Sequence, residues 1–193
     1  MARAEAAGVA EGGPWPFELE LIGRGATEEL GVALAELALA GDVVALEGDL
    51  GAGKTALVRG LARGLGIDDS VASPTYVLMD ALEGGRLPLY HFDAWLDGRE
   101  KALFADGGDE WLRGHGLAVV EWASRVALWL PLPRLEVRLQ HVDPGRRRAL
   151  LVPLEAAPGS GSSAPRGWAQ RLGPLRAALA ARVAAAADGP EFG

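Results

Sequence analysis

The stretch Gly48–Thr55, which reads GDLGAGKT, decides the fold of this 193-residue chain. It contains the complete pattern Gly-x4-Gly-Lys-Thr. A short apolar run, Val43–Leu46, lies just before it and has the composition of a buried parallel strand. Apolar residues at helical spacing follow over 54–65. A strand, a glycine-rich loop and a helix in this order predict a phosphate-binding loop. They also predict an α/β fold of the P-loop NTPase type, with three layers and a mostly parallel sheet flanked by helices.

The residue types in this loop suit a nucleoside triphosphate and its metal ion. The glycines let backbone N–H groups point at phosphate oxygens without a clash from a Cβ atom. The helix that follows offers free N–H groups and a favourable dipole. Lys54, one of only two lysines among nineteen basic residues, supplies a mobile cation for the terminal phosphates. The Thr55 hydroxyl is a hard oxygen ligand for Mg²⁺. We predict that ATP is bound by Gly48, Gly51, Ala52, Gly53, Lys54, Thr55 and Ala56.

Two acidic residues downstream each end a predicted strand. Asp93 follows the strand over 87–92, and Glu121 follows the strand over 117–120. A carboxylate at the carboxyl end of a parallel strand faces the nucleotide crevice, so we assign Asp93 to Mg²⁺, directly or through a water molecule. Glu121 either polarises the attacking water or completes the metal shell. The predicted catalytic residues are Lys54, Asp93 and Glu121, and the predicted metal ligands are Thr55, Asp93 and Glu121.

Two neighbours of these acids could belong to the same site. His91 stands two positions before Asp93, so both side chains can share one face of the strand; its role stays open between a hydrogen bond near the site and simple packing. Trp122 follows Glu121 directly and is the one tryptophan of six that we keep as a candidate site residue. Trp95, Trp111 and Trp129 fit core or rim packing.

The rest of the chain divides into segments around this centre. We predict a disordered lead-in over 1–16, a P-loop domain over 17–155, a Gly/Ser/Pro linker over 156–167 and a C-terminal helix over 168–187. Within the domain we predict a strand over Phe17–Leu21, a helix from an N-cap at Thr27 to Gly41, and a hairpin formed by 135–139 and 148–152. The run Arg146–Arg148 in that hairpin is interpreted as a solvated turn or a partner contact.

Composition limits the class of protein. No apolar run is long enough to span a membrane, and there is no cysteine for a disulfide or a thiolate metal site. These features fit a cytoplasmic protein with no membrane contact. The net charge of −7 argues against a protein that binds nucleic acid by itself.

The order of four motifs resembles one family. GDLGAGKT is followed by SPTY at 73–76, YHFD at 90–93 and VEW at 120–122. This order is similar to that of the bacterial TsaE family, also called YjeE, over about residues 17–152. SPTY also lies where switch segments of P-loop proteins often run, although the residues alone favour an ordinary proline turn.

The resemblance implies a function and a set of roles. TsaE proteins are small P-loop ATPases of tRNA threonylcarbamoyladenosine (t6A) biosynthesis. They act with the TsaB–TsaD pair, which modifies adenosine 37 of tRNA, so contact with tRNA would be indirect. By resemblance, Lys54 meets phosphate, Thr55 binds Mg²⁺, and Arg24 lies in the segment near the nucleotide base. Asp93 matches the aspartate of the family's HFD motif, and Glu121 the acid of its VEW motif. Leu96 and Ala102 depart from the family's usual residues.

Two other functions use the same loop. A small P-loop metabolite or nucleoside kinase would need an acceptor pocket and an arginine-rich lid. A nucleotide-gated binding module would bind ATP without useful turnover, and Glu121 separates that case from an ATPase.

Overall fold

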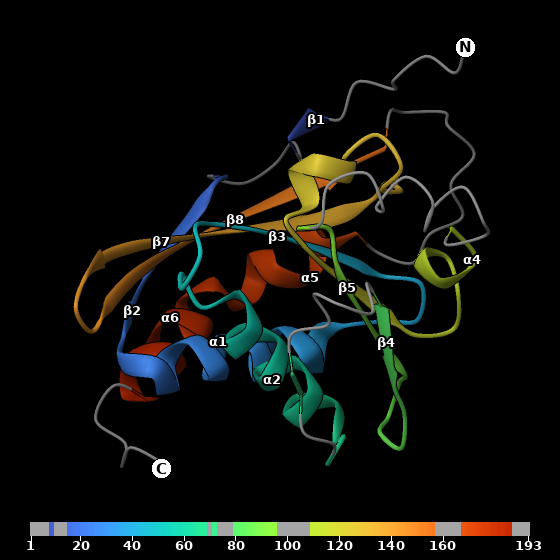
Figure 1. Ribbon diagram of the computed structural model, residues 1–193. Helices are drawn as coiled ribbons and strands as arrows, with labels where there is room; N and C mark the ends of the chain where they lie inside the picture. Colours follow the sequence, from blue (N-terminus) through green and yellow to red (C-terminus); the bar gives the residue numbers. More distant parts are fainter. Residues whose placement is uncertain are drawn as a thin grey trace.

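The structure, a computed structural model, describes residues 8–9, 15–68, 71–72, 79–95, 109–156 and 167–186. Within those ranges one eight-stranded sheet forms the centre of the molecule (Figure 1). The strands run in the order β1-β8-β7-β3-β6-β5-β4, and β2 also pairs with β8. Their bounds are β1 Gly8–Val9, β2 Phe17–Ile22, β3 Val43–Glu47, β4 Met79–Leu82, β5 Leu89–Asp93, β6 Leu117–Glu121, β7 Arg134–Asp143 and β8 Arg146–Glu155.

The centre of the sheet is parallel and its edges are antiparallel. Strands β7, β3, β6 and β5 all run in one direction, whereas β8 and β4 run against their neighbours. The carboxyl ends of β3, β5 and β6 therefore meet at one edge, where a ligand binds in open α/β sheets.

Helices cover both faces of this sheet. One face carries α1 (Gly23–Leu37), α2 (Lys54–Leu65), α5 (Trp168–Leu172), the 3-10 turn η3 (Gly173–Leu175) and α6 (Arg176–Ala185) (Figure 1). The other face carries the short α4 (Asp109–Leu112) and the 3-10 turn η2 (Ala123–Val126). The predicted α/β fold, with helices flanking a sheet that is parallel at its centre, is confirmed.

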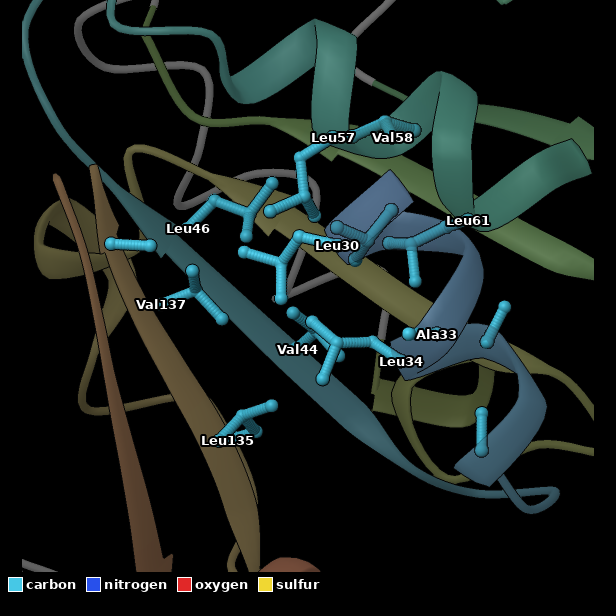
Figure 2. Packing of buried hydrophobic residues seen from close by; sticks show 14 of the residues in the cluster. Leu30, Ala33, Leu34, Val44, Leu46, Leu57, Val58, Leu61, Leu135 and Val137 are labelled. Atoms are coloured by element: carbon cyan, nitrogen blue, oxygen red, sulfur yellow. The ribbon is translucent and has the colours of Figure 1, made fainter. Parts of the chain in front are cut away.

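Apolar side chains of α1 and α2 fill the space above β3 and β7. Figure 2 shows Leu57 of α2 and Leu30 of α1 pointing toward β3, where Leu46 and Val44 lie. The two helices approach closely because glycines lie at their crossing: a Cβ atom on Gly60 would lie 1.9 Å from the carbonyl oxygen of Glu28. This contact fixes the direction of α2, whose first turn follows the glycine-rich loop.

The structure corrects the predicted start of α1. The helix begins at Gly23 rather than at an N-cap Thr27, and its cap residue, Ile22, makes no side-chain hydrogen bond. Thr27 is instead buried inside the helix. The reason is tertiary: the Gly23 N–H donates to the carbonyl oxygen of Gly145 in the β7–β8 turn, at 2.7 Å, and so starts the helix earlier.

The C-terminal segment is helical but not one helix. Pro174 lacks a backbone N–H, and the chain passes through η3 between α5 and α6. These helices dock on the domain, because Trp168, Leu172, Leu179 and Val183 are buried in the core shared with α1. Arg171 adds a two-pronged ion pair with Asp42 at 2.5 and 2.8 Å. None of the helices in the described ranges is long and apolar enough to cross a membrane.

The division into segments is only partly covered by the described residues. Gly8–Val9, inside the stretch predicted to be a disordered lead-in, pairs with β8 as β1, and Trp15 packs against the core. The predicted linker lies outside the described residues except at its two ends. The segment bounds therefore stay a prediction.

Candidate nucleotide-binding site

The glycine-rich loop joins the end of β3 to the start of α2 with a backbone that requires glycine. Gly48, Gly51 and Gly53 have φ angles of 142°, 80° and 107°, a region that residues with a Cβ atom rarely adopt. Gly48 is also too close to β7 for a side chain, because its Cβ would lie 2.3 Å from the Leu139 carbonyl oxygen. Gly53 is the N-cap of α2. The loop thus presents its backbone at a helix N-terminus, the usual site for a phosphate.

Lys54 is held inside this loop by its own backbone. Its Nζ donates to the carbonyl oxygens of Gly48 and Asp49 at 2.6 and 3.0 Å, and the residue is only 5% exposed. Burial lowers the pKa of Lys54, although Glu121 and Asp93 act in the opposite direction. A cation that is poorly solvated and held by neutral oxygens is well prepared to bind an anion.

The carboxylate of Glu121, at the end of β6, contacts two other polar side chains, one from α2 and one from β5. The Thr55 hydroxyl donates to Glu121 Oε1 at 3.0 Å, and His91 Nε2 lies 3.0 Å from the same oxygen. Asp93 stands directly opposite Glu121 in the β5–β6 pairing. Both acids are 3% exposed, and the Trp95 N–H donates to Asp93 Oδ1 at 2.9 Å. The predicted metal ligands are therefore neighbours.

His91 is a residue whose place in the site the sequence left open. Its imidazole is fully buried and pairs with Glu121. The available signal was strand alternation, which puts His91 and Asp93 on one face of β5. That signal could not show which residue of β6 lies beside the imidazole.

Aromatic rings border the same site. Lys54 Nζ lies 3.6 Å from the ring centroid of Trp122, and the Trp95 ring packs on Trp122 at 4.4 Å. Trp122 has a φ of 59°, a left-handed conformation that is uncommon for a residue with a side chain. The structure thus places Trp122 at the loop.

Some predicted residues are elsewhere or outside the described ranges. Arg24 is on the first turn of α1, where its 66%-exposed side chain pairs with Glu28 at 3.3 Å. Its contact with the base stays a prediction. The SPTY segment at 73–76, Leu96 and Ala102 lie outside the described residues.

A cavity of about 460 Å³ borders the start of the glycine-rich loop, at Gly48 and Asp49. Glu47, Asp49, Leu130 and Arg134 are among its lining residues. Gly48 also lines it, whereas Lys54, Thr55 and Glu121 do not, so the cavity shares only the start of the loop with the predicted phosphate site.

Comparisons with known proteins agree on one family. The family model described as Threonylcarbamoyl adenosine biosynthesis protein TsaE matches residues 23–149. A relative from Nostoc sp., named tRNA threonylcarbamoyladenosine biosynthesis protein TsaE, is 38% identical over 136 residues, which cover 69% of this chain and 83% of the relative. A relative of the same name from Bacillus subtilis is 39% identical over 122 residues, covering 63% of this chain and 75% of the relative.

A solved structure shares the fold. The crystal structure of YdiB from Bacillus subtilis superposes with a TM-score of 0.62 at 32% sequence identity. The match covers 71% of this chain and 84% of YdiB. Helices α5 and α6 begin after the residues that the family model matches.

Proposed function

The chain belongs to the TsaE family of tRNA threonylcarbamoyladenosine biosynthesis proteins, and from this premise we propose that it is a Mg²⁺-dependent ATPase that acts with the TsaB–TsaD pair in forming t6A. ATP is the nucleotide, and contact with tRNA is made only through the TsaB–TsaD pair. The proposal places the protein in the cytoplasm, with no membrane contact.

One observation carries the hydrolytic part of the proposal: the hydrogen bond of 3.0 Å between Thr55 and Glu121. The Thr55 hydroxyl, which is expected to meet the metal ion, lies in the first turn of α2. Glu121 is a buried carboxylate at the end of β6. A loop that only binds phosphate has no need of this carboxylate, whereas hydrolysis needs a group that orients water.

The residues fit Mg²⁺ as it is held in nucleotide sites. Thr55, Asp93 and Glu121 offer hard oxygen ligands. No group of three or more acidic, histidine or cysteine side chains in the described ranges forms a cage for a metal ion. That agrees with Mg²⁺, which is bound by one or two carboxylates together with substrate phosphates. When held by these residues, Mg²⁺ would neutralise the negative charge of the phosphates.

The other side chains have complementary tasks in this proposal. Lys54 exchanges its two carbonyl partners for the terminal phosphates. Glu121 accepts a hydrogen bond from the attacking water and orients it. His91, 3.0 Å from Glu121, keeps that carboxylate in position. His91 touches neither nucleotide nor water in this scheme and is a positioning residue.

The experiment is to measure Mg-ATP binding and phosphate release with and without the cognate TsaB–TsaD pair, together with t6A formation on tRNA. We expect binding by the chain alone, association with the pair and phosphate release in its presence. Lys54→Ala should lose most of the affinity for ATP, with circular dichroism as the control for folding. An unchanged dissociation constant in Lys54→Ala would remove the phosphate-loop assignment. No association with TsaB–TsaD, combined with phosphate transfer to a small metabolite, would favour a kinase.

A further inference from the structure

Three elements meet on one side of the phosphate loop. The β7–β8 turn accepts a hydrogen bond from the first residue of α1, and the next residues of β8 reach the start of α2. A Cβ atom placed on Gly53 would lie 3.4 Å from both Cδ and Nε of Arg147 and 3.4 Å from Cγ2 of Thr27. Arg147 and Thr27 therefore flank the N-cap of α2.

Both side chains have buried polar atoms without partners. Arg147 Nε and Thr27 Oγ1 are buried and make no hydrogen bond in the described part of the chain, and Thr27 is only 1% exposed. Buried polar atoms in folded proteins are nearly always bonded. The Thr27 atom beside Gly53 is its methyl group, whereas the unbonded Arg147 Nε itself lies beside Gly53 and indicates a polar ligand there.

The neighbours of Arg147 behave differently. Arg146 pairs with Asp143 and Glu20, and Arg148 pairs with Glu18 at 2.9 Å, in both cases on the exposed surface. Strand alternation turns only the middle arginine toward the face that carries the helices. The run therefore contains two surface arginines and one that faces the loop. The interpretation as a solvated turn or partner contact applies to Arg146 and Arg148, and Arg147 has a different environment.

The sheet order indicates which end of the nucleotide Arg147 meets. In that order β8 and β7 lie on one side of β3, and β6 and β5 lie on the other. Glu121 and Asp93 belong to β6 and β5 and are the proposed metal side, where β- and γ-phosphate oxygens bind. The α-phosphate and the nucleoside must then lie toward β7 and β8, beside Gly53.

We propose that Arg147 binds the α-phosphate of the nucleotide. A guanidinium group suits this task because its planar fork matches two phosphate oxygens. The inference rests on the proposed nucleotide site. It adds to that site a cation from β8, which lies on the other side of β3 from the strands of Glu121 and Asp93. Arg147 would contact ADP and ATP equally, and it would not contact a pyrophosphate that fills only the β and γ positions.

The test is isothermal titration calorimetry with Mg-ATP, Mg-ADP and inorganic pyrophosphate in the presence of Mg²⁺. For Arg147→Ala we expect the affinities for ATP and ADP to fall by the same factor, about ten- to a hundredfold, with the pyrophosphate affinity nearly unchanged. Arg147→Lys keeps the charge but not the fork, so an intermediate loss is expected. Arg146→Ala and Arg148→Ala are the matched controls and should bind like the wild type.

A thermal melt without nucleotide separates a binding role from a structural one. Arg147 Nε has no partner to lose, so Arg147→Ala should melt at the wild-type temperature or above it. A lower melting temperature with unchanged affinity would show a structural role and overturn the inference.

The other outcomes are also distinct. If the wild type binds nucleotide and both Arg147 variants bind equally well, the inference fails while the proposed function stands. A loss of pyrophosphate affinity as large as that for ATP in Arg147→Ala would place the guanidinium at the terminal phosphates and overturn the α-phosphate assignment. If the wild type binds none of the three probes, the proposed function itself fails.

Discussion

Replacing Trp168 by alanine should strongly destabilise the protein without affecting its nucleotide site. Trp168 is 0% exposed and packs in the same core as Leu172 and Val183. Truncating a fully buried tryptophan costs about 3–5 kcal/mol in transfer free energy and cavity formation. For a chain of this length each kcal/mol lowers the melting temperature by about 2–4 °C. The melting temperature of Trp168→Ala should therefore fall by about 6–20 °C.

The assay is thermal unfolding followed by circular dichroism, with Mg-ATP affinity measured well below the transition. Trp168→Phe is the matched control: it keeps most of the apolar volume and removes an indole Nε1 that is buried without a hydrogen-bond partner. Its melting temperature should fall by much less. A melting temperature for Trp168→Ala within about 1 °C of the wild type would refute the docking of α5 and α6 on the domain.

Two further changes test how the phosphate loop and the C-terminal helices are supported. Gly60→Ala puts a methyl group 1.9 Å from the Glu28 carbonyl oxygen. The free energy of unfolding, measured by urea denaturation, should fall by about 1–3 kcal/mol. Gly173→Ala is the control: Gly173 has open space around it, so this change should be neutral or stabilising. Asp42→Ala leaves Arg171 unpaired at a largely buried position and should cost about 3–5 kcal/mol; a loss below about 0.5 kcal/mol would mean that this pair is solvated.

The centre of the fold could be predicted because local signals agree there. Val43–Leu46, the loop and α2 each have a distinct pattern, and the structure has β3 over Val43–Glu47 and α2 over Lys54–Leu65. The strands that end in Asp93 and Glu121 were also found, because short apolar runs end at acids. Asp93 and Glu121 lie side by side because the strand ends of a parallel sheet share one edge, and Thr55 contacts Glu121.

The features that sequence reasoning missed depend on contacts distant in sequence. Thr27 has the chemistry of an N-cap, but the hydrogen bond from Gly23 to Gly145 starts α1 one turn earlier. The pairing of His91 with Glu121 depends on the register between β5 and β6. The orientation of Arg147 toward the loop depends on the position of β8 in the sheet. The sequence shows three adjacent arginines and gives no reason to distinguish them.

Phosphate release by Glu121→Gln tests the central claim most directly. The glutamine keeps an oxygen that can accept the Thr55 hydrogen bond and removes the charge that orients water. Wild type and variant are compared with Mg-ATP and the cognate TsaB–TsaD pair. We expect wild-type ATP affinity in the variant and a rate of phosphate release that is about a hundred- to ten-thousandfold lower. A variant that releases phosphate at the wild-type rate would contradict the assignment of this site as an ATPase centre built on Glu121.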